Sequence, residues 1–199
     1  RFEMADWLEL VGWYVTEGSL DSARGRVTLH QSDGDGRATI RALLDRMDIP
    51  YSTDDRGFNI SNQHLVDWLG VHCGRDAADK QLPTWVFELD GEMLRDLLDT
   101  LIQGDGSQTA SGLEKYWTTS DTLKDDIVDL AVRCGEKPTV SRESDGTWYV
   151  SIGKRGSFNK STNATTEPHD GTVHCITAED NHVILAGRNG HYQWIGQSL

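Results

Sequence analysis

Two carboxylates, Glu17 and Asp105, occupy the same place in two apolar segments, Leu10 to Gly18 and Leu98 to Gly106. Each segment has the character of a helix that ends in an acid followed by glycine. A helix carries partial negative charge at its C-terminus, so a carboxylate there is unfavourable unless a cation offsets it. Two hard oxygen ligands, with water and a phosphate oxygen, suit Mg²⁺. The pair therefore predicts a magnesium site suited to phosphodiester hydrolysis.

Two glycines are expected to bring these acids together. Gly12 and Gly104 are small enough to let the two helices pack closely, with Glu17 and Asp105 at the same end. We predict that Gly18 and Gly104 also belong to the metal site. Two or three Mg²⁺ ions are expected to be shared between the two acids. Either acid alone is better explained as a polar turn residue after a buried helix. Their recurrence in one frame favours the metal site.

The two segments are part of an internal repeat. Sliding the sequence by 88 positions lays the first acid-ended segment on the second. A frame that also matches other landmarks favours duplication of one unit over chance similarity. Those landmarks are Ser32-Asp33 on Ser120-Asp121, Pro50 on Pro138 and, with the shift relaxed by one residue, Ile40 to Met47 on Ile127 to Cys134.

Each half predicts the same series of elements. The glycine after each acid is expected to end its helix in a left-handed turn. A strand follows, then a helix capped by Asp33 or Asp121 with its neighbouring serine and ending near Pro50 or Pro138, then a hairpin. The strands and hairpins are centred on Arg26–Gln31, Lys115–Thr119, Gly57–Ile60 and Thr147–Ile152.

These elements predict an α+β fold. We expect a duplicated αββαββα architecture with pseudo-twofold symmetry, in halves at about 5–75 and 90–155 of a domain spanning 1–160. A Ser-, Thr- and Asn-rich linker, 161–170, precedes a separate segment, 171–197.

Composition sets limits on the class of protein. A chain of 199 residues with 37% hydrophobic content can bury a core, and none of its apolar runs approaches the roughly 20 residues of a membrane helix. Three widely spaced cysteines argue against a disulfide framework or a zinc site. We expect a soluble, cytoplasmic, monomeric protein. Since the first residue is Arg1, we expect the sequence to begin inside a longer precursor.

The net charge of −13 opposes DNA binding, because phosphate contacts normally come from a surplus of lysine and arginine. The acids are mostly Asp and the bases mostly Arg, a bias that we associate with halophilic proteins, in which salt screens exposed charges. A basic groove can also persist on an acidic body.

The acid-ended segments resemble the paired motifs of LAGLIDADG homing endonucleases. Lys80-Gln-Leu-Pro-Thr-Trp85 resembles the lysine-containing block of intein endonucleases, and Ser120 to Gly135 is similar to the block after the second motif. The resemblance spans about residues 8–160. It implies metal-dependent double-strand cleavage at a long DNA site, with Glu17 and Asp105 as metal ligands and Lys80 near the reacting phosphate.

The resemblance also implies a second lysine from the other half. Lys154 and Lys160 are both candidates for this lysine. We assign Lys160 to the catalytic residues and Lys154 to the DNA-binding residues. The second motif departs from the family pattern at Thr100, which replaces its first glycine, and Glu17 replaces the commoner Asp of the first motif. Neither change removes a carboxylate.

For DNA recognition, the paired strands of each half are expected to form a saddle that enters the major groove. The alternative for each residue is a solvated strand face. The candidate DNA-binding residues are Arg24, Arg26, His30, Gln31 and Arg56 in the first half, and Lys115, Arg142 and Lys154 in the second.

The C-terminal segment resembles the last splicing blocks of inteins, in Gly171 to Ala186 and in Tyr192 to Ser198. The resemblance implies a short β segment of an intein (Hint-type) splicing domain. In that case residues 198–199 begin the downstream host segment, and the Ser198 hydroxyl accepts the acyl chain. Gln197 would release the intein through its side-chain amide.

Two more residues belong to this splicing hypothesis. Gly196 replaces the usual penultimate histidine, so His182 or another group must assist. Cys175 is either a nucleophile or a buried strand residue. The N-terminal splicing half is not part of this sequence, so splicing requires that half as a partner in cis or in trans.

The sequence therefore favours an intein-encoded site-specific DNA endonuclease attached to the C-terminal part of a protein-splicing element. One alternative is a splicing fragment whose endonuclease has decayed. Another is a DNA-binding regulator on the same fold, which would bind a specific site without cutting it.

Overall fold

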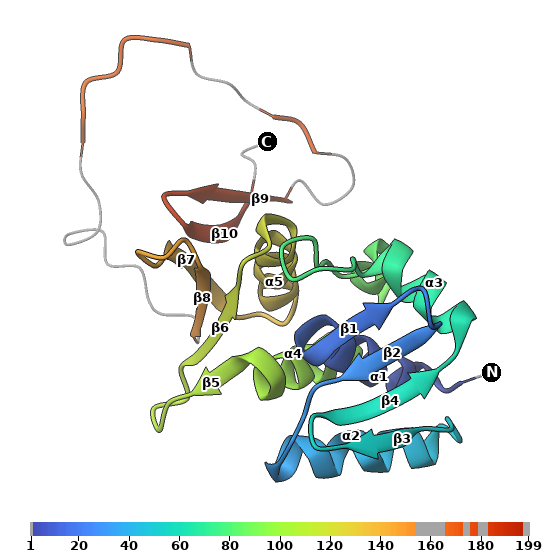
Figure 1. Cartoon of the computed structure of the whole chain (residues 1–199). Helices are drawn as coiled ribbons and strands as arrows, with labels where there is room; N and C mark the ends of the chain where they lie inside the picture. Colours follow the sequence, from blue (N-terminus) through green and yellow to red (C-terminus); the bar gives the residue numbers. More distant parts are fainter. Residues whose placement is uncertain (1, 154–165, 173–175, 179–182, 197–199) are drawn as a thin grey trace.

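The computed structural model describes residues 2–153, 166–172, 176–178 and 183–196, and it consists of two α/β halves joined side by side (Figure 1). Each half has an antiparallel sheet with helices on one of its faces. Helices α1 (Met4–Glu17) and α4 (Gly91–Asp105) are the first helix of each half and pack against each other at the centre of the molecule.

The two halves share one strand order, as a duplicated unit would. The first sheet has the order β1-β2-β4-β3, and the second contains β5-β6-β8-β7 in the equivalent order. The first half consists of α1, β1 (Gly18–Asp21), β2 (Arg26–Leu29), α2 (Gly34–Arg46), β3 (Ser52–Asp54), β4 (Gly57–Ser61) and α3 (Gln63–His72). The second consists of α4, β5 (Gly106–Gln108), β6 (Glu114–Thr118), α5 (Asp121–Arg133), β7 (Lys137–Arg142) and β8 (Trp148–Gly153).

The expected third helix of the second half is not among the described residues, which break off after β8. In the first half, the N-cap of α3 is Asn62, whose side chain accepts a hydrogen bond from the Leu65 amide at 3.1 Å. The full αββαββα series is thus described in one half and its first six elements in the other.

Helices α2 and α5 correspond with a shift of 87 residues, the relaxed register of the repeat. The Asp33 carboxylate caps α2 by accepting from the Gly34 amide at 2.7 Å. The cap of α5 is Ser120, which accepts from the Leu123 amide at 3.1 Å, so Asp121 is the first helical residue. Both helices end before the expected prolines are reached.

The expected left-handed turn after each acid is wrong. Gly18 has φ −91° and Gly106 has φ −114°, both in the extended region from which β1 and β5 start. Steric crowding explains the glycines instead. A Cβ on Gly18 would lie 2.8 Å from the Tyr14 Cα, and one on Gly106 would lie 2.6 Å from the Ile102 Cα.

Close contact between α1 and α4 depends on two complementary pairs. A Cβ on Gly12 would lie 2.8 Å from the Thr100 Cγ2, and one on Gly104 would lie 2.6 Å from the Thr16 Cβ. Gly12 and Thr100 are equivalent in the repeat, as are Thr16 and Gly104. Residues that contact their own equivalents lie on the twofold axis, so each pair has one glycine and one threonine where two threonines would collide.

The segment between the halves places Lys80 against α5. The Ser120 hydroxyl donates to the Lys80 carbonyl at 2.7 Å, and the Leu82 amide donates to Asp126 Oδ2 at 2.7 Å. A single-turn helix, η1 (Thr84–Glu88), then leads into α4.

A C-terminal hairpin, β9 (Val183–Arg188) and β10 (His191–Gly196), extends the second sheet to the order β5-β6-β8-β7-β10-β9. Its turn contains Asn189 and Gly190, both with positive φ. The Gly190 carbonyl accepts from the Val140 amide at 2.7 Å, which joins β10 to β7. The expected separate splicing segment is therefore hydrogen-bonded to the second half here.

None of the helices within the described ranges has the length and apolar content needed to cross a membrane.

Candidate metal and nucleic-acid site

The acids that end α1 and α4 lie at the same end of the helix pair, as the repeat predicted. Asp105 faces a hollow of about 280 Å³ between the two halves, which the Lys80 side chain also lines. Glu17 and Asp105 are near enough for each other's charge to matter, because Glu17 contributes to the pKa shift of Asp105. The remaining lining residues are Val15, Thr16, Gly18, Ala77, Trp117, Thr118, Thr119, Leu123 and Thr147.

Burial, and for Asp105 also repulsion by Glu17, disfavours the ionised form of the two acids at this end of the helix pair. Burial, and secondly the negative charge of Glu17, raise the pKa of Asp105 from 3.8 to about 7, against the opposing effect of Lys80. Burial also raises the pKa of Glu17, while the hydrogen bond from Gln31 and the nearby His30 lower it. Two carboxylates that resist ionisation together are stabilised by a cation placed between them.

Lys80 is buried and holds the end of α1. Its Nζ donates to the Tyr14 carbonyl at 2.7 Å and to the Gly18 carbonyl at 2.9 Å, and it lies 3.4 Å from the centre of the Tyr14 ring. Burial lowers the pKa of the ammonium from 10.5 to about 8. An ammonium has three donors, so one remains for a group in the hollow.

We expect Lys80→Met to lower the free energy of unfolding by about 1–3 kcal/mol, because two buried carbonyls lose a charged donor. Lys124→Met on α5 is the matched control, since that ammonium pairs with the exposed Asp125 at 2.9 Å. Urea unfolding of both variants measures the difference. Equal stability of the two variants would show that the carbonyl contacts of Lys80 contribute nothing.

Two residues that the sequence did not assign to the acids adjoin them in the structure. Gln31, expected to bind DNA, donates from Nε2 to Glu17 Oε1 at 2.7 Å and so orients that carboxylate. Tyr116 is fully buried, and its hydroxyl has no hydrogen-bond partner among the described residues. Burial and the charges of Asp105 and Glu17 raise the Tyr116 pKa well above 10.0.

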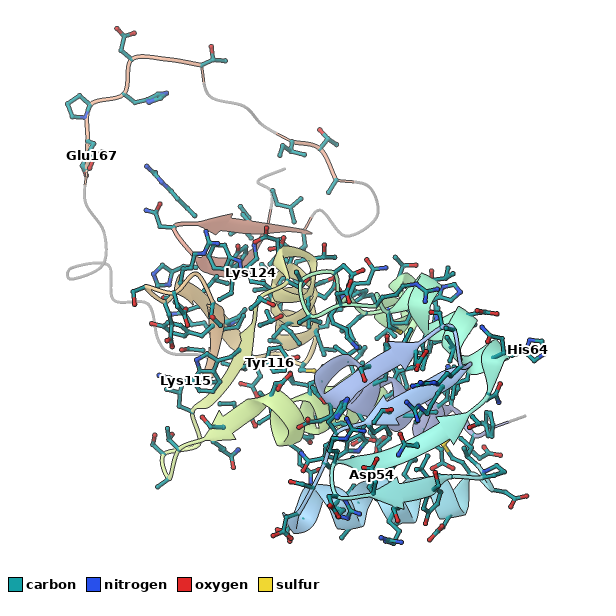
Figure 2. The ribbon with its side chains drawn as sticks, in the orientation of Figure 1. Asp54, His64, Lys115, Tyr116, Lys124 and Glu167 are labelled. Atoms are coloured by element: carbon teal, nitrogen blue, oxygen red, sulfur yellow. The ribbon has the colours of Figure 1, made fainter. Side chains whose placement is uncertain are left out.

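The alternation of side chains along the strand could have predicted that Tyr116 faces the helices. The spacing of β6 puts it on the face opposite Lys115, and Figure 2 shows Tyr116 on the helix side of the strand. Its partner in the ladder is Gly106, the residue directly after Asp105. The sequence shows the alternation but not that this strand runs beside the acid.

The outward face of the first sheet is polar, and its arginines are paired. Arg24 and Arg26 lie 3.3 and 3.6 Å from Asp21, and Arg56 lies 3.6 Å from Asp54. Exposed ion pairs of this kind are worth about 0–1 kcal/mol, so a phosphate can displace them. His30 is also exposed and lies 2.7 Å from the Ser19 hydroxyl.

The two candidate DNA-binding residues described in the second sheet, Lys115 and Arg142, lie on opposite faces of it. Lys115 lies opposite Ser151 in the ladder and projects outward, with its Nζ 5.3 Å from the Tyr149 ring. Arg142 lies opposite Trp148, whose indole donates to Asp121 on α5. Arg142 is therefore on the helix side of the sheet, away from Lys115. Arg142 thus does not share the outward face of Lys115, and its contact with DNA stays a prediction.

The residues present fit a divalent cation held mainly by water and phosphate. The described residues contain no group of three or more His, Cys, Asp or Glu side chains arranged to hold a metal. Glu17 and Asp105 thus supply two carboxylates, which leaves positions for oxygens of water and DNA. The Gly18 carbonyl accepts a hydrogen bond from Lys80, and a Cβ on Gly104 would collide with Thr16, while a role of these two glycines in the metal site stays a prediction.

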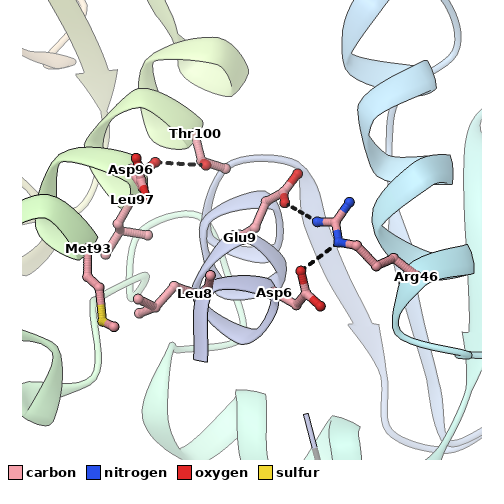
Figure 3. A pocket seen from close by; sticks show the side chains of 9 residues that line it. Asp6, Leu8, Glu9, Arg46, Met93, Asp96, Leu97 and Thr100 are labelled. Atoms are coloured by element: carbon pink, nitrogen blue, oxygen red, sulfur yellow. Dashed lines mark hydrogen bonds and ion pairs between the residues drawn. The ribbon is translucent and has the colours of Figure 1, made fainter. Parts of the chain in front are cut away.

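A second hollow, of about 170 Å³, lies at the other end of α1 and α4 (Figure 3). Arg46 bridges Asp6 at 2.7 Å and Glu9 at 2.8 Å there. This arrangement joins α2 to α1 and pairs Asp6 and Glu9 with one guanidinium, so it is a structural contact.

Several predicted site residues lie outside the described residues. These are Lys154, Lys160, Cys175, His182, Gln197 and Ser198.

Solved structures with a similar fold include a LAGLIDADG domain and a protein in complex with its target DNA. Full-length DUF199/WhiA from Thermatoga maritima has a TM-score of 0.54 at 12% identity, over 76% of this chain and 52% of that one. An I-DmoI variant in complex with its target DNA and in the presence of manganese has a TM-score of 0.52 at 11% identity, over 74% and 86%. The N-terminal LAGLIDADG domain of DUF199/WhiA has 0.52 at 12%, over 77% of both chains.

Two curated proteins are similar in sequence over part of their length. One is the proteolytic component of an ATP-dependent Clp protease of Chlamydomonas moewusii, 25% identical over 155 residues, which are 71% of this chain and 15% of that protein. The other belongs to the DNA gyrase of Mycobacterium gordonae and is 32% identical over 91 residues, which are 44% of this chain and 16% of that protein. The chain thus spans about one sixth of the length of these relatives. No family model matches it.

The α+β LAGLIDADG-type fold expected from the sequence is confirmed. The fold resembles both I-DmoI, which is in complex with its target DNA in that structure, and DUF199/WhiA.

Proposed function

We propose that this chain is a site-specific DNA endonuclease that makes metal-dependent double-strand cuts, carried within an intein. The observation that carries the proposal is the meeting of Glu17 and Asp105 at one end of the α1–α4 pair, beside the Lys80 ammonium and between two sheets. A regulator that only binds DNA has no need for two mutually repelling acids at this position. DNA is also the partner in the similar I-DmoI complex.

A divalent ion bound here would activate water and stabilise the leaving oxygen of a phosphodiester. Side chains of this protein would position the ion and the phosphate for that reaction. Gln31 fixes the orientation of Glu17, and the twofold packing of α1 and α4 sets the separation of the acids. Lys80 has a free donor for a phosphoryl oxygen, and with a pKa of about 8 it can also take a proton from water as a neutral amine.

The intein context is supported by the two curated relatives. A protease and a gyrase have different activities, yet each protein shares with this chain a stretch of only 15% or 16% of its own length. A segment inserted into unrelated host proteins accounts for that distribution. The splicing residues proposed from the sequence, Cys175, His182, Gln197 and Ser198, belong to this part of the proposal, as do the boundaries 1–160, 161–170, 171–197 and 198–199.

The test of cutting uses a pool of plasmids with randomised inserts, incubated with the protein and Mg²⁺ or Mn²⁺. We expect a small set of related inserts to be linearised, and sequencing of the cut ends to give one long site. The same pool with a chelator is the control. Selective binding without linearisation in either metal would overturn the endonuclease proposal and favour the regulator.

The regulator is the second candidate because the WhiA structures share the fold. The net charge of −13 and the paired arginines of the first sheet oppose DNA binding by either candidate, so they do not favour one over the other. The plasmid experiment separates the two candidates directly.

A further inference from the structure

One transverse row of side chains crosses the second sheet on the face turned away from the helices. Directly paired residues of an antiparallel ladder project to the same face, so the pairings trace the row from strand to strand. The C-terminal hairpin continues the row beyond β7. In order from β5 to β9, the row consists of Ser107, Lys115, Ser151, Thr139, His191 and Arg188.

The row contains no carboxylate, in a chain with 32 acids and 19 Lys and Arg residues. Lys137 lies two residues before Thr139 and therefore adds a cation to the same face. Lys137 and Arg188 are exposed, and neither forms an ion pair with another described residue. The equivalent face of the first sheet differs, because Arg26 there lies opposite Asp21 and is paired with it.

The dimensions suit a long polyanion. Strands about 4.8 Å apart make a row over six strands about 24 Å long, which is more than the width of the major groove. Beside its outer end is a hollow of about 340 Å³, lined by Lys137, Arg188 and His191 with Tyr192 and Ile195. Figure 1 shows the hairpin beside β7, at the edge of the second sheet opposite β5.

We propose that the β9–β10 hairpin extends the DNA-binding surface, with Arg188 and Lys137 contacting the phosphate backbone of duplex that flanks the cut site. The inference rests on the proposed function, since it takes DNA as the partner. It gives the C-terminal segment a role in binding that is separate from splicing. The same face also has the aromatic residues Trp117 and Tyr149 on β6 and β8 and the aliphatic residues Ile184 and Ile195 on the hairpin. The row itself consists of hydrogen-bonding and cationic side chains, with Arg188 and Lys137 at its hairpin end, so phosphate is the better match there than an apolar peptide.

The experiment measures binding of the full chain to a long duplex of arbitrary sequence, with a chelator present, over a series of salt concentrations. Phosphate contacts are independent of sequence, so no target site is needed. The double variant Lys137→Gln/Arg188→Gln is compared with Arg41→Gln/Arg46→Gln on α2. Both remove two positive charges, but the control changes a helix that covers the other face of the first sheet.

We expect the hairpin variant to bind more weakly and the slope of log affinity against log salt to fall by about one for each phosphate that is no longer bound, or about two in all. The control should keep the wild-type slope. An unchanged slope in the hairpin variant overturns the inference, as does an equal fall in the control, which would indicate net charge alone. Thermal unfolding of both variants verifies that they remain folded.

The outcomes distinguish this inference from the proposed function. If the wild type cuts plasmid DNA and the hairpin variant keeps the wild-type salt dependence of binding, the endonuclease proposal is supported and the proposed role of the hairpin is overturned. If the wild type binds duplex DNA without cutting it, and the salt dependence of binding is lower in the hairpin variant, the role of the hairpin in binding is supported and the endonuclease proposal is overturned. Wild type that binds no duplex at any salt concentration overturns both.

Discussion

Asp105→Asn is expected to abolish DNA cleavage and, without metal, to stabilise the fold at pH 8. The variant keeps the shape of the side chain but removes one of two carboxylates that would hold the ion. Loss of several kcal/mol of transition-state stabilisation corresponds to a fall in rate of about a thousandfold or more. The rate of plasmid linearisation measures this, with Glu17→Gln expected to have the same effect. Cutting within about tenfold of wild type by either variant would show that its acid is not a metal ligand.

The gain in stability follows from the pKa of Asp105. Its folded pKa of about 7 lies above the ordinary 3.8, so the folded state binds more protons between these values. Stability from this group is fully present below about pH 4, falls as the pH rises through about 7, and is absent above it. Asparagine removes the penalty at pH 8, by about 1 kcal/mol after allowance for solvent in the hollow.

Urea unfolding at pH 8 and at pH 4, both with chelator, measures this effect. The variant should be the more stable protein at pH 8, and the difference should disappear at pH 4, where wild-type Asp105 is protonated in the folded state. A variant that is less stable than wild type at pH 8 would mean that the ionised carboxylate has a favourable partner in the folded state.

Gly104→Ala is expected to destabilise the protein by about 1–3 kcal/mol, because the new Cβ has no room beside Thr16 at the α1–α4 contact. The same substitution at Gly91, the first residue of α4, meets nothing within 4 Å and should be neutral or stabilising by up to about 1 kcal/mol. Thermal unfolding compares the two variants. Cleavage should fall with Gly104→Ala, since separating the helices also separates Glu17 from Asp105.

The repeat provides a sharper test of that contact. Because Thr16 and Gly104 are equivalent under the twofold axis, the pair Thr16→Gly/Gly104→Thr moves the larger side chain to the other helix. The double variant should be more stable than Gly104→Thr alone, with a coupling energy above about 1 kcal/mol. Additive effects would show that the two residues do not share one space.

Much of the fold could be predicted from the sequence because the chain contains two copies of one pattern. The strands around Arg26 and Lys115 and the helices after Asp33 and Ser120 follow from alternation, capping residues and helical periodicity. The limits of the pattern appear at the motif glycines. Gly18 was assigned a left-handed turn from its residue type alone, whereas crowding against Tyr14 explains it.

In the candidate site, too, some features could be predicted from the sequence and others could not. The position of the two acids at helix ends is local and could be predicted, as could the proximity of Lys80 through the resemblance. The partners of the acids could not. Gln31 reaches them from the loop after β2 in the first half and Tyr116 from β6 in the second. The face of Arg142 depends on its pairing with Trp148 in the ladder. These contacts join residues far apart in the chain.

The sequence by itself determined the repeat, the series of elements and the identities of the two acids, because each depends on local spacing and residue type. Only the tertiary structure decided how Gly12 and Gly104 pair with threonines across the axis, how Lys80 is buried against α1, and how the C-terminal hairpin joins β7. The physical reason is that strand register and helix contact depend on side chains from distant segments meeting in one place.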